Sequence, residues 1–320
     1  MYSFKKSGLY IISAIAIILI IALISVIYFS IPPRDFPNGA IFSIKKDMTI
    51  GETAVQLEKL SIIRSKFIYK VYAIMLNGES GVQAGDYLFD TPQSTLKIAD
   101  RTVHGIQGLE KIKILIPEGS DSRAIVKILS KNIAGFDSVK FLALAKQNEG
   151  YLFPDTYFFN PNVTPDEVII EMRTTFYRKL STLEEKISAS KKSLSDILKM
   201  ASIVEKEANN NADRKLIAGV LWKRIEAGMP LQVDPPFFYF LNKTSSQLTL
   251  ADLKVKSPYN LYQNMGLPPT PICNPGLNAI IATIEPIASK YWYYLSDSDG
   301  VMHYATTHDG HLANKEKYIR

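Results

Sequence analysis

The clearest pattern along the chain is a periodic alternation of apolar and polar positions. Between Leu194 and Ala208 apolar residues recur every three or four positions, which predicts a helix with one buried face. A second stripe of this kind runs from Asp213 to Ala227, and Gly228 follows it as a typical helix-ending residue. We expect these two helices to form the centre of the larger part of the protein.

The longest apolar run, Leu9 to Phe29, contains no charged residue. At about 1.5 Å per residue it would span roughly 30 Å, the thickness of the hydrocarbon core of a bilayer. A cleaved signal peptide is the alternative, but the run is too long and no small-x-small cleavage site follows it. We therefore predict a transmembrane anchor at residues 9–29. Lys5 and Lys6 precede this run, and Arg34, Lys45 and Lys46 follow it; the closest charges favour a cytoplasmic location for residues 1–8.

After the apolar run, residues 30–39 contain three prolines and end in a glycine, and we expect a stiff linker. The patterns that follow predict a small α+β unit at residues 40–117. Its expected strands are Ile41–Ile44, Gly85–Phe89 and Lys111–Ile116, and its expected helices are Ile50–Leu60, Ser65–Leu76 and Thr95–Val103.

Residues 118–320 are expected to form a larger mixed α/β unit around the helix at 194–208, so the whole chain is predicted to be α+β. Thr164-Pro165 has the cap and first-turn proline of a long helix. The other expected elements are helices at Ser122–Leu129 and Asp137–Gln147, an exposed continuation or loop at Ser181–Ser193, a surface loop at Asn242–Gln247, and a hairpin of Tyr291–Ser296 and Val301–Ala305.

The composition narrows the function classes. The chain has 320 residues, 47% of them hydrophobic, and a formal charge of +6, with no basic run interleaved with aromatic residues. Nucleic acid is therefore a poor partner, whereas an anionic wall polymer or a lipid surface would suit the charge, although scattered surface lysines explain it equally well. Cys273 is the single cysteine, which excludes an internal disulfide and a cysteine-rich metal site.

Three histidines near the end of the chain, His303, His308 and His311, suggest a metal site as one hypothesis. Asp309-Gly310 is poor helix sequence, and no further ligand is signalled. We favour hydrogen bonding within a cleft wall, or capping of a terminal helix, and expect no metal and no cofactor. Phosphate-loop, nucleophile-elbow and zinc-protease motifs do not occur in the sequence.

The candidate chemistry lies at the end of the helix that begins at Leu194, in Glu205-Lys206-Glu207. A carboxyl on a largely apolar helix loses hydration, which raises its pKa and makes it a possible proton donor near neutral pH. The two glutamates point about 200° apart. Glu205 lies nearer the apolar face, and Glu207 lies on its flank, from which a side chain could enter a cleft. Ion-paired helix acids without a catalytic role are the alternative explanation.

Several further motifs occur along the chain, on both sides of this segment. They are Glu149-Gly-Tyr-Leu-Phe-Pro-Asp155-Thr-Tyr157, Gln232-Val-Asp234-Pro-Pro236, Ser257-Pro-Tyr259-Asn260-Leu-Tyr262, Gly266-Leu-Pro-Pro269 and Asn274-Pro-Gly276. Together with Glu205-Lys-Glu207 they resemble the endolytic murein transglycosylase family, also called YceG-like. The resemblance covers nearly the whole chain. It departs from the family pattern at Pro236, where a small polar residue is expected, and this puts the fine geometry of that loop in doubt.

The resemblance implies a single-glutamate mechanism. In such enzymes the C6 hydroxyl of N-acetylmuramic acid attacks its own C1, so one carboxyl can first protonate the leaving oxygen and then accept the hydroxyl proton. The family's acid falls on Glu207, and Glu205 becomes a supporting residue. Residues 40–117 look like the family's LysM-like subdomain, for which a plain spacer role is at least as good an explanation.

Substrate-binding residues are also carried over from the resemblance. They are Gln232, Asp234, Ser257, Tyr259, Asn260, Tyr262, Glu149 and Asp155. Turn chemistry is the alternative for Asp234 and Ser257, because each precedes a proline. For Asn274 we prefer a capping role in a helix that starts at Pro275.

The resemblance also implies a location and partners. We expect residues after the anchor to lie on the extracytoplasmic side of the inner membrane. The expected partners are peptidoglycan strands, the bilayer through Leu9–Phe29 and wall-synthesis enzymes. The competing hypothesis is a membrane-anchored wall-binding or assembly protein without turnover.

Overall fold

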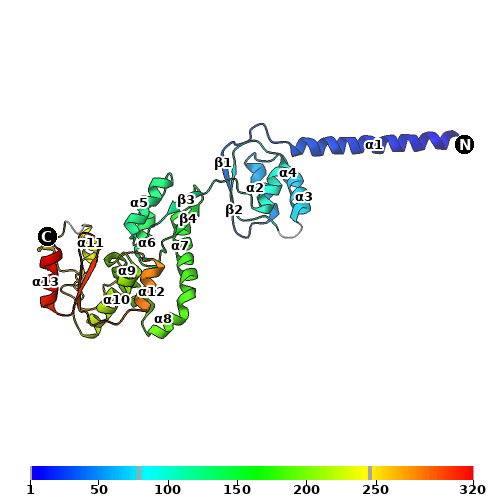
Figure 1. Ribbon diagram of the computed structural model, residues 1–320. Helices are drawn as coiled ribbons and strands as arrows, with labels where there is room; N and C mark the ends of the chain where they lie inside the picture. The colour runs from blue at the N-terminus through cyan, green and yellow to red at the C-terminus, as the bar shows by residue number, and fades with distance from the viewer. Residues whose placement is uncertain (1, 78–80, 244–246, 320) are drawn as a thin grey trace. The chain divides into compact units, whose positions relative to one another are not determined.

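The structure is a computed structural model that describes residues 2–77, 81–243 and 247–319. The described chain forms two compact units, Met1–Glu110 and Lys111–Arg320 (Figure 1). The predicted boundary at residue 117 therefore lies inside the second unit. The reason is strand pairing: β3 (Ile112–Leu115) pairs antiparallel with β4 (Thr156–Phe159), so it belongs with the residues that follow it.

The first unit begins with a single apolar helix, α1 (Tyr2–Ser30). Within it, Ser13–Ser30 has a mean hydropathy of 2.7 and is long enough to cross a bilayer. None of these residues is buried against the rest of the protein. The helix is compatible with the expected single-pass anchor.

The folded part of the first unit has the order strand, helix, helix, strand, helix. The elements are β1 (Ala40–Ile44), α2 (Ile50–Lys59), α3 (Lys66–Asn77), β2 (Gly85–Phe89) and α4 (Thr95–His104). Every one of them was predicted to within a few residues. Thr49 and Glu52 form a capping box at the start of α2, which satisfies two backbone N–H groups. The two strands pair antiparallel, and a core that includes Tyr69, Tyr87 and Phe89 lies beneath them.

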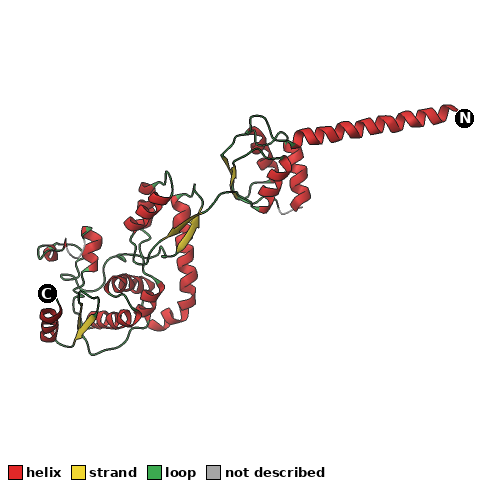
Figure 2. Cartoon of the chain, turned by 45° about the horizontal axis from the view of Figure 1, so that its top comes forward, coloured by secondary structure: helices red, strands yellow, loops and turns green. Residues whose placement is uncertain are grey.

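The second unit is mostly helical, with two short antiparallel strand pairs (Figure 2). Its first half contains β3, β4, α5 (Ser122–Asn132), α6 (Ser138–Lys146) and α7 (Pro165–Leu180) around one apolar cluster. The predicted polar continuation after α7 folds as a 3-10 turn, Ser181–Leu183, and a short helix, α8 (Glu184–Ser190). β4 is an element that the sequence did not predict.

The second half of this unit is built around α9 (Leu194–Glu207), as predicted. α9 packs against α10 (Asn211–Glu226) and α12 (Leu277–Ile284), and its apolar residues from Ile197 to Val204 are fully buried. Burying each large apolar side chain stabilises the fold by about 2 kcal/mol. Gly219 allows a close approach, since a Cβ there would collide with the Ile287 carbonyl oxygen.

The rest of the unit contains a short helix, a 3-10 turn at Asp252–Lys254, a strand pair and a last helix. α11 (Pro235–Leu241) is a short helix where we had expected polar turns. The predicted hairpin is present as β5 (Tyr293–Ser296) and β6 (Met302–Ala305), followed by α13 (His308–Tyr318). Part of the predicted loop Asn242–Gln247 lies outside the described residues. The segment from Ser257 to Pro269 contains no helix or strand among its described residues, as expected.

Candidate active site

Glu207 is the last residue of α9, which ends because Ala208 takes an extended conformation. The residue as a whole is partly exposed, but its carboxyl group is surrounded by protein. Burial raises the pKa of Glu207 to about 7; the Asp234 carboxylate adds to this rise and the Tyr294 hydroxyl opposes it. The helix C-terminus, which carries a partial negative charge, also disfavours an anion there. A large fraction of this carboxyl is therefore protonated at neutral pH.

The groups beside Glu207 come from separate segments. Asp234 immediately precedes α11, and its Oδ1 accepts a hydrogen bond of 2.7 Å from the Tyr262 hydroxyl. Tyr294 lies on β5, and its hydroxyl is buried with no partner of standard hydrogen-bond geometry among the described residues. Burial and the nearby Glu207 raise the pKa of Tyr294 well above its usual value. Tyr294 is thus a neutral donor beside the carboxyl.

The buried guanidinium of Arg224 connects the segments that carry these groups. Arg224 of α10 donates to the carbonyl oxygens of Trp292 at 2.9 Å and Leu231 at 2.7 Å. These bonds connect α10 to β5 and to the segment before Asp234. The charge of Arg224 also opposes the rise in pKa of Tyr294.

Glu205 has a different environment from Glu207. Its side chain is 5% exposed, and its Oε1 lies 2.8 Å from Arg214 Nη2 on α10. Its other oxygen accepts a hydrogen bond of 2.8 Å from the backbone N–H of Gly276, the residue before α12. Glu205 therefore connects the ends of three helices; its predicted supporting role stays a prediction.

A second carboxyl with a raised pKa belongs to Glu149. Burial raises its pKa to about 7, and hydrogen bonds from Ser122 and Asn274 oppose the rise. The Ser122 hydroxyl donates at 2.6 Å to one oxygen, and the Asn274 amide donates at 2.8 Å to the other. Glu149 was predicted to bind substrate; in the structure it is 4% exposed and lies at a pocket.

This pocket has a volume of about 430 Å³. Its wall contains an aromatic group, Tyr239, Phe240 and Tyr259, in which the Tyr259 ring centroid lies 5.5 Å from that of Tyr239. The remaining lining residues are Ser122, Arg123, Leu142, Lys146 and Glu149. Aromatic rings beside polar groups are typical of ligand sites, and Tyr259 is one of the predicted binding residues.

A row of rings connects this pocket to the group around Glu207. Tyr262 contacts Phe237 at 5.8 Å, Phe237 contacts Phe240 at 5.3 Å, and Phe240 contacts Tyr259 at 6.3 Å between ring centroids. α11 carries the two phenylalanines, and Asp234 lies at its start. At about 1.5 Å per residue, Phe240 is roughly 9 Å along the helix from Asp234. The pocket and Asp234, one of the groups beside Glu207, thus lie along one helix.

Three other residues that were predicted to bind substrate do not line this pocket. Asn260 is fully buried, and its amide donates to the carbonyl oxygens of Leu253 and Val255, so it shapes the loop from inside. Ser257 accepts a hydrogen bond from the Tyr259 backbone. Gln232 is exposed and has a φ of 50°, a left-handed conformation.

Asp155 and Asn274 also differ from expectation. Asp155 lies 3.3 Å from Lys179 in a half-exposed ion pair. Asn274 does not cap α12, since Gly276 occupies the N-cap position. Its fully buried side chain instead accepts from the backbone N–H groups of Gly150 and Leu152 and donates to Ser120 and Glu149. The oxygen and the nitrogen of this buried amide are both hydrogen-bonded, so Asn274 connects three loops. The spacing of residues in the sequence did not predict these contacts.

The histidines and the cysteine have structural contacts. His303 lies 2.7 Å from Asp297 and stacks on Tyr318, while His308 and His311 contact the Tyr293 ring. Thr307 provides the cap of α13. Among the residues that the structure describes, no group of three or more His, Cys, Asp or Glu side chains could hold a metal ion. Cys273 is fully buried, and burial raises the pKa of its thiol.

Sequence reasoning missed several residues of the site. Tyr294 of β5 lies beside Glu207, Arg224 of α10 acts on the pKa of Tyr294, and Arg214 of α10 pairs with Glu205, but periodicity alone did not reveal these roles. A tyrosine-rich strand and arginines inside an apolar stripe were the available signals, because a buried arginine needs carbonyl or carboxylate partners. Tyr239 and Phe240 were missed because α11 was not expected.

Comparison with known proteins gives the following similarities. The sequence model of the YceG-like family matches residues 42–317. A Bacillus subtilis protein named endolytic murein transglycosylase is 30% identical over 313 positions, which cover 89% of this chain and 86% of that protein. A Streptococcus pneumoniae protein of the same name is 29% identical over 86% of this chain, which spans 59% of that protein's length. A solved structure of a yceG-like protein from Listeria monocytogenes has a TM-score of 0.59 and 28% identity, over 86% of this chain and 99% of that one.

Proposed function

The chain belongs to the YceG-like family, and on that premise we propose that it is a membrane-anchored endolytic lytic transglycosylase. Its substrate is peptidoglycan, in which it cleaves the bond between N-acetylmuramic acid and N-acetylglucosamine within nascent strands. The product ends are 1,6-anhydromuramyl groups. Relatives that share about 30% of their residues with most of this chain carry the name endolytic murein transglycosylase.

The observation that carries the proposal is the raised pKa of Glu207, about 7, at the end of a buried helix. A general acid works best when its pKa is near the working pH. The Asp234 carboxylate beside it keeps Glu207 protonated, and it would also stabilise positive charge that develops at C1 of the sugar.

The reaction needs one proton donor that later becomes an acceptor. Glu207 protonates the glycosidic oxygen while the C1–O bond breaks and an oxocarbenium-like sugar forms. The C6 hydroxyl of the same sugar then attacks C1, and its proton returns to Glu207. Because the nucleophile is part of the substrate, a second carboxylate that activates water is not required. Tyr262 holds Asp234 through the hydrogen bond of 2.7 Å, and the neutral Tyr294 hydroxyl lies beside Glu207.

The substrate subsites follow from the same contacts. We assign the pocket at Glu149 and Tyr259 to glycan binding, supported by the row of rings that leads from it toward Asp234. Tyr262 and Asp234 contribute at the reacting sugar. Gln232 and Ser257 remain candidates, and the buried place of Asn260 supports only an indirect role.

The location and partners are part of the proposal. The apolar helix α1 anchors the chain in the cytoplasmic membrane, with both units outside the cytoplasm. The order β1, α2, α3, β2 with paired strands supports a LysM-like unit that binds glycan. An enzyme that acts on nascent strands works beside the enzymes that make them, so wall-synthesis enzymes are proposed neighbours.

The test is product analysis with uncross-linked glycan strands made in vitro. The full chain in detergent micelles is incubated with these strands, and the released ends are identified by mass spectrometry. Anhydromuramyl ends that disappear with Glu207→Gln support the proposal. Reducing muramic acid ends would instead show hydrolysis, and intact strands would favour a wall-binding protein without turnover. Protease added to intact spheroplasts should digest both units; full protection would contradict the orientation.

A further inference from the structure

The outer face of α3 is unusually apolar for a helix in contact with water. Tyr69 and Ala73 are turned into the core of the first unit. On the opposite side, Phe67 is 68% exposed, Val71 38%, Ile74 56% and Met75 76%. These four residues follow a spacing of four, three and one, so they form a single stripe along the helix. We call them the α3 stripe.

α3 contacts the end of the apolar helix α1 through Tyr72, a residue beside the α3 stripe. The Ser30 hydroxyl is hydrogen-bonded to the Tyr72 hydroxyl of α3 at 2.8 Å, and the Thr95 hydroxyl donates to the Phe29 carbonyl at 3.1 Å. Arg64, just before α3, donates twice to the Pro32 carbonyl, at 3.1 and 3.0 Å. The end of α1 is therefore held against the unit by side chains. In both views α3 lies on the side of the unit from which α1 leaves, and β1 lies on the far side (Figures 1 and 2).

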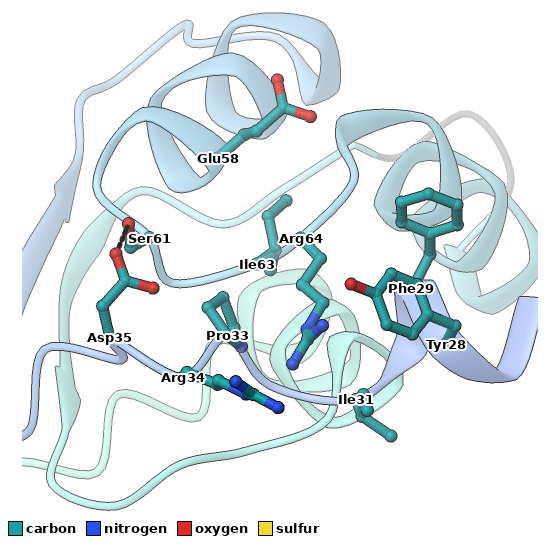
Figure 3. Close-up of a pocket in the computed structure, with 10 residues that line it drawn as sticks. All are labelled: Tyr28, Phe29, Ile31, Pro33, Arg34, Asp35, Glu58, Ser61, Ile63 and Arg64. Atoms are coloured by element: carbon teal, nitrogen blue, oxygen red, sulfur yellow. Dashed lines mark hydrogen bonds between the residues drawn. The ribbon is translucent and has the colours of Figure 1, made fainter.

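A pocket of about 750 Å³ opens at the same junction (Figure 3). Its lining includes Tyr28 and Phe29 from the end of α1, Ile31, and the guanidinium groups of Arg34 and Arg64. Tyrosine is frequent where a transmembrane helix meets the headgroup layer. Arg64 also lies over the Tyr28 ring at 4.7 Å.

Both acidic side chains of this pocket have partners within the described part of the chain, whereas one of its arginines has none. The Asp35 carboxylate accepts from the Ser61 hydroxyl at 2.7 Å, and Glu58 accepts from the Lys66 backbone at 2.9 Å and lies 3.6 Å from its ammonium group. Arg34 has no ion pair or hydrogen bond within the described part of the chain. A guanidinium without a partner suits a phosphate, which it can bind with two parallel hydrogen bonds.

We propose that the α3 stripe and the pocket at Arg34 and Arg64 rest on the bilayer surface in which α1 is anchored. The stripe enters the boundary between headgroups and acyl chains, and the two arginines bind the phosphate of an anionic phospholipid. The proposal rests on the anchor role of α1. Continuity argues for lipid as the occupant, because the helix that carries the stripe contacts the end of the apolar helix, and the side chains at this junction are interfacial in type. This lipid contact would hold the first unit at the membrane surface.

The depth of the stripe can be measured with a fluorescent label. Cys273 is the single cysteine and is fully buried, so an introduced surface cysteine is labelled selectively. Met75→Cys and Ile41→Cys are matched positions: both are exposed and apolar, but Ile41 is on β1. The full chain is placed in nanodiscs of phosphatidylcholine and phosphatidylglycerol whose acyl chains carry bromine. We expect quenching of the label at 75 to exceed that at 41 several-fold.

A third label, Ile24→Cys in α1, distinguishes the proposed lipid contact of α3 from the proposed anchor role of α1. Quenching at 24 and not at 75 would overturn the lipid contact of α3 and leave the anchor intact. Loss of quenching at 24 would overturn the anchor and the lipid contact together. If the stripe instead joins two copies of the chain, the label at 75 would be protected from lipid and would cross-link between copies, which also overturns the proposal.

The phosphate contact is tested with Arg34→Gln. Short-chain phosphatidylglycerol is titrated into the full chain in neutral detergent micelles. A cation near lipid phosphates contributes about 1 kcal/mol, so we expect about fivefold weaker binding. Lys46→Gln removes an equal charge at an exposed position after β1 and should leave binding unchanged. Equal affinities of Arg34→Gln and the parent chain, or equally tight binding of inorganic phosphate, would overturn the phospholipid site.

Discussion

Glu205 and Arg214 form an ion pair of 2.8 Å that links the last turn of α9 to the first turn of α10. Their side chains are 5% and 10% exposed, so neither charge has much access to water. The second oxygen of Glu205 holds the Gly276 backbone before α12. The carboxylate that stands two residues before Glu207 therefore fixes the place where Glu207 leaves its helix.

Removing one partner of this pair should be strongly destabilising. Arg214→Met leaves the Glu205 carboxylate buried without its cation, and we expect a loss of about 3 kcal/mol or more in the free energy of unfolding in urea. Lys215→Met is the control on the same helix. Lys215 is 34% exposed and 3.7 Å from Glu285, so its loss should be less than about 1 kcal/mol. Similar losses in both variants would contradict the structural role of the pair.

Glu207→Gln should separate catalysis from stability. The amide keeps the shape of the carboxyl but cannot donate its proton, so formation of anhydromuramyl ends should fall at least about a hundredfold. Glu205→Gln should act mainly through stability. Near-normal turnover in Glu207→Gln together with loss in Glu205→Gln would reverse the two roles.

The same substitution should stabilise the protein at higher pH. The pKa of Glu207 rises from 4.5 to about 7 on folding, so the folded state prefers the protonated acid. Its contribution is favourable below pH 4.5 and is lost as the pH rises through 7. Relative to the parent chain, Glu207→Gln should therefore gain on the order of 2 kcal/mol between pH 5 and pH 8. Urea titrations at these two pH values measure the gain, and a constant difference would contradict the raised pKa.

Activity should fall on the alkaline side. The acid form of Glu207 is the active one, and its pKa is about 7, so kcat/KM should decrease about tenfold for each pH unit well above 7. Asp234→Asn removes the neighbouring carboxylate that helps to raise this pKa, and it should move the decrease to lower pH. A decrease that stays in place would mean that another group controls the profile.

Tyr259→Ala should affect turnover more than stability. Its ring forms part of the pocket wall, so losing one aromatic contact with the glycan should reduce kcat/KM about tenfold. Tyr291→Ala is the matched control, since Tyr291 is also half-buried and stacks on Tyr304 at 5.2 Å outside this pocket. Thermal melts and product formation are compared. A large drop in Tm with normal turnover would mark Tyr259 as a core residue.

Asn274→Ala should unfold the loops beside Glu149. The substitution leaves the buried N–H groups of Gly150 and Leu152 without an acceptor, and each such group costs about 1 to 3 kcal/mol. We expect at least about 2 kcal/mol of destabilisation, measured in urea. Asn278→Ala, at an exposed position of α12, should change stability little. Equal effects would contradict the role of Asn274 as the acceptor for these two N–H groups.

The sequence by itself determined the elements of the first unit, the helix α9 and the identity of the acid candidates, but not β4 or α11. Helical spacing from Leu194 onward predicted α9, and the wheel placed Glu205 nearer the packed face than Glu207. The first unit was predicted element by element because its caps and turns are local signals, such as the Thr49 capping box. These features depend on residues only a few positions apart.

Only the tertiary structure decided which groups meet at the acid and how the chain divides. Tyr294 lies 87 positions after Glu207 in the sequence and Asp234 lies 27 positions after it, yet both act on its pKa. Asn274 was read as a cap from its neighbours, while its real partners lie more than 120 positions away. β3 was assigned to the wrong unit because its pairing with β4 spans α5 and α6. The physical reason is common to all: hydrogen bonds and charges act through space, and periodicity reports only which face of an element is buried.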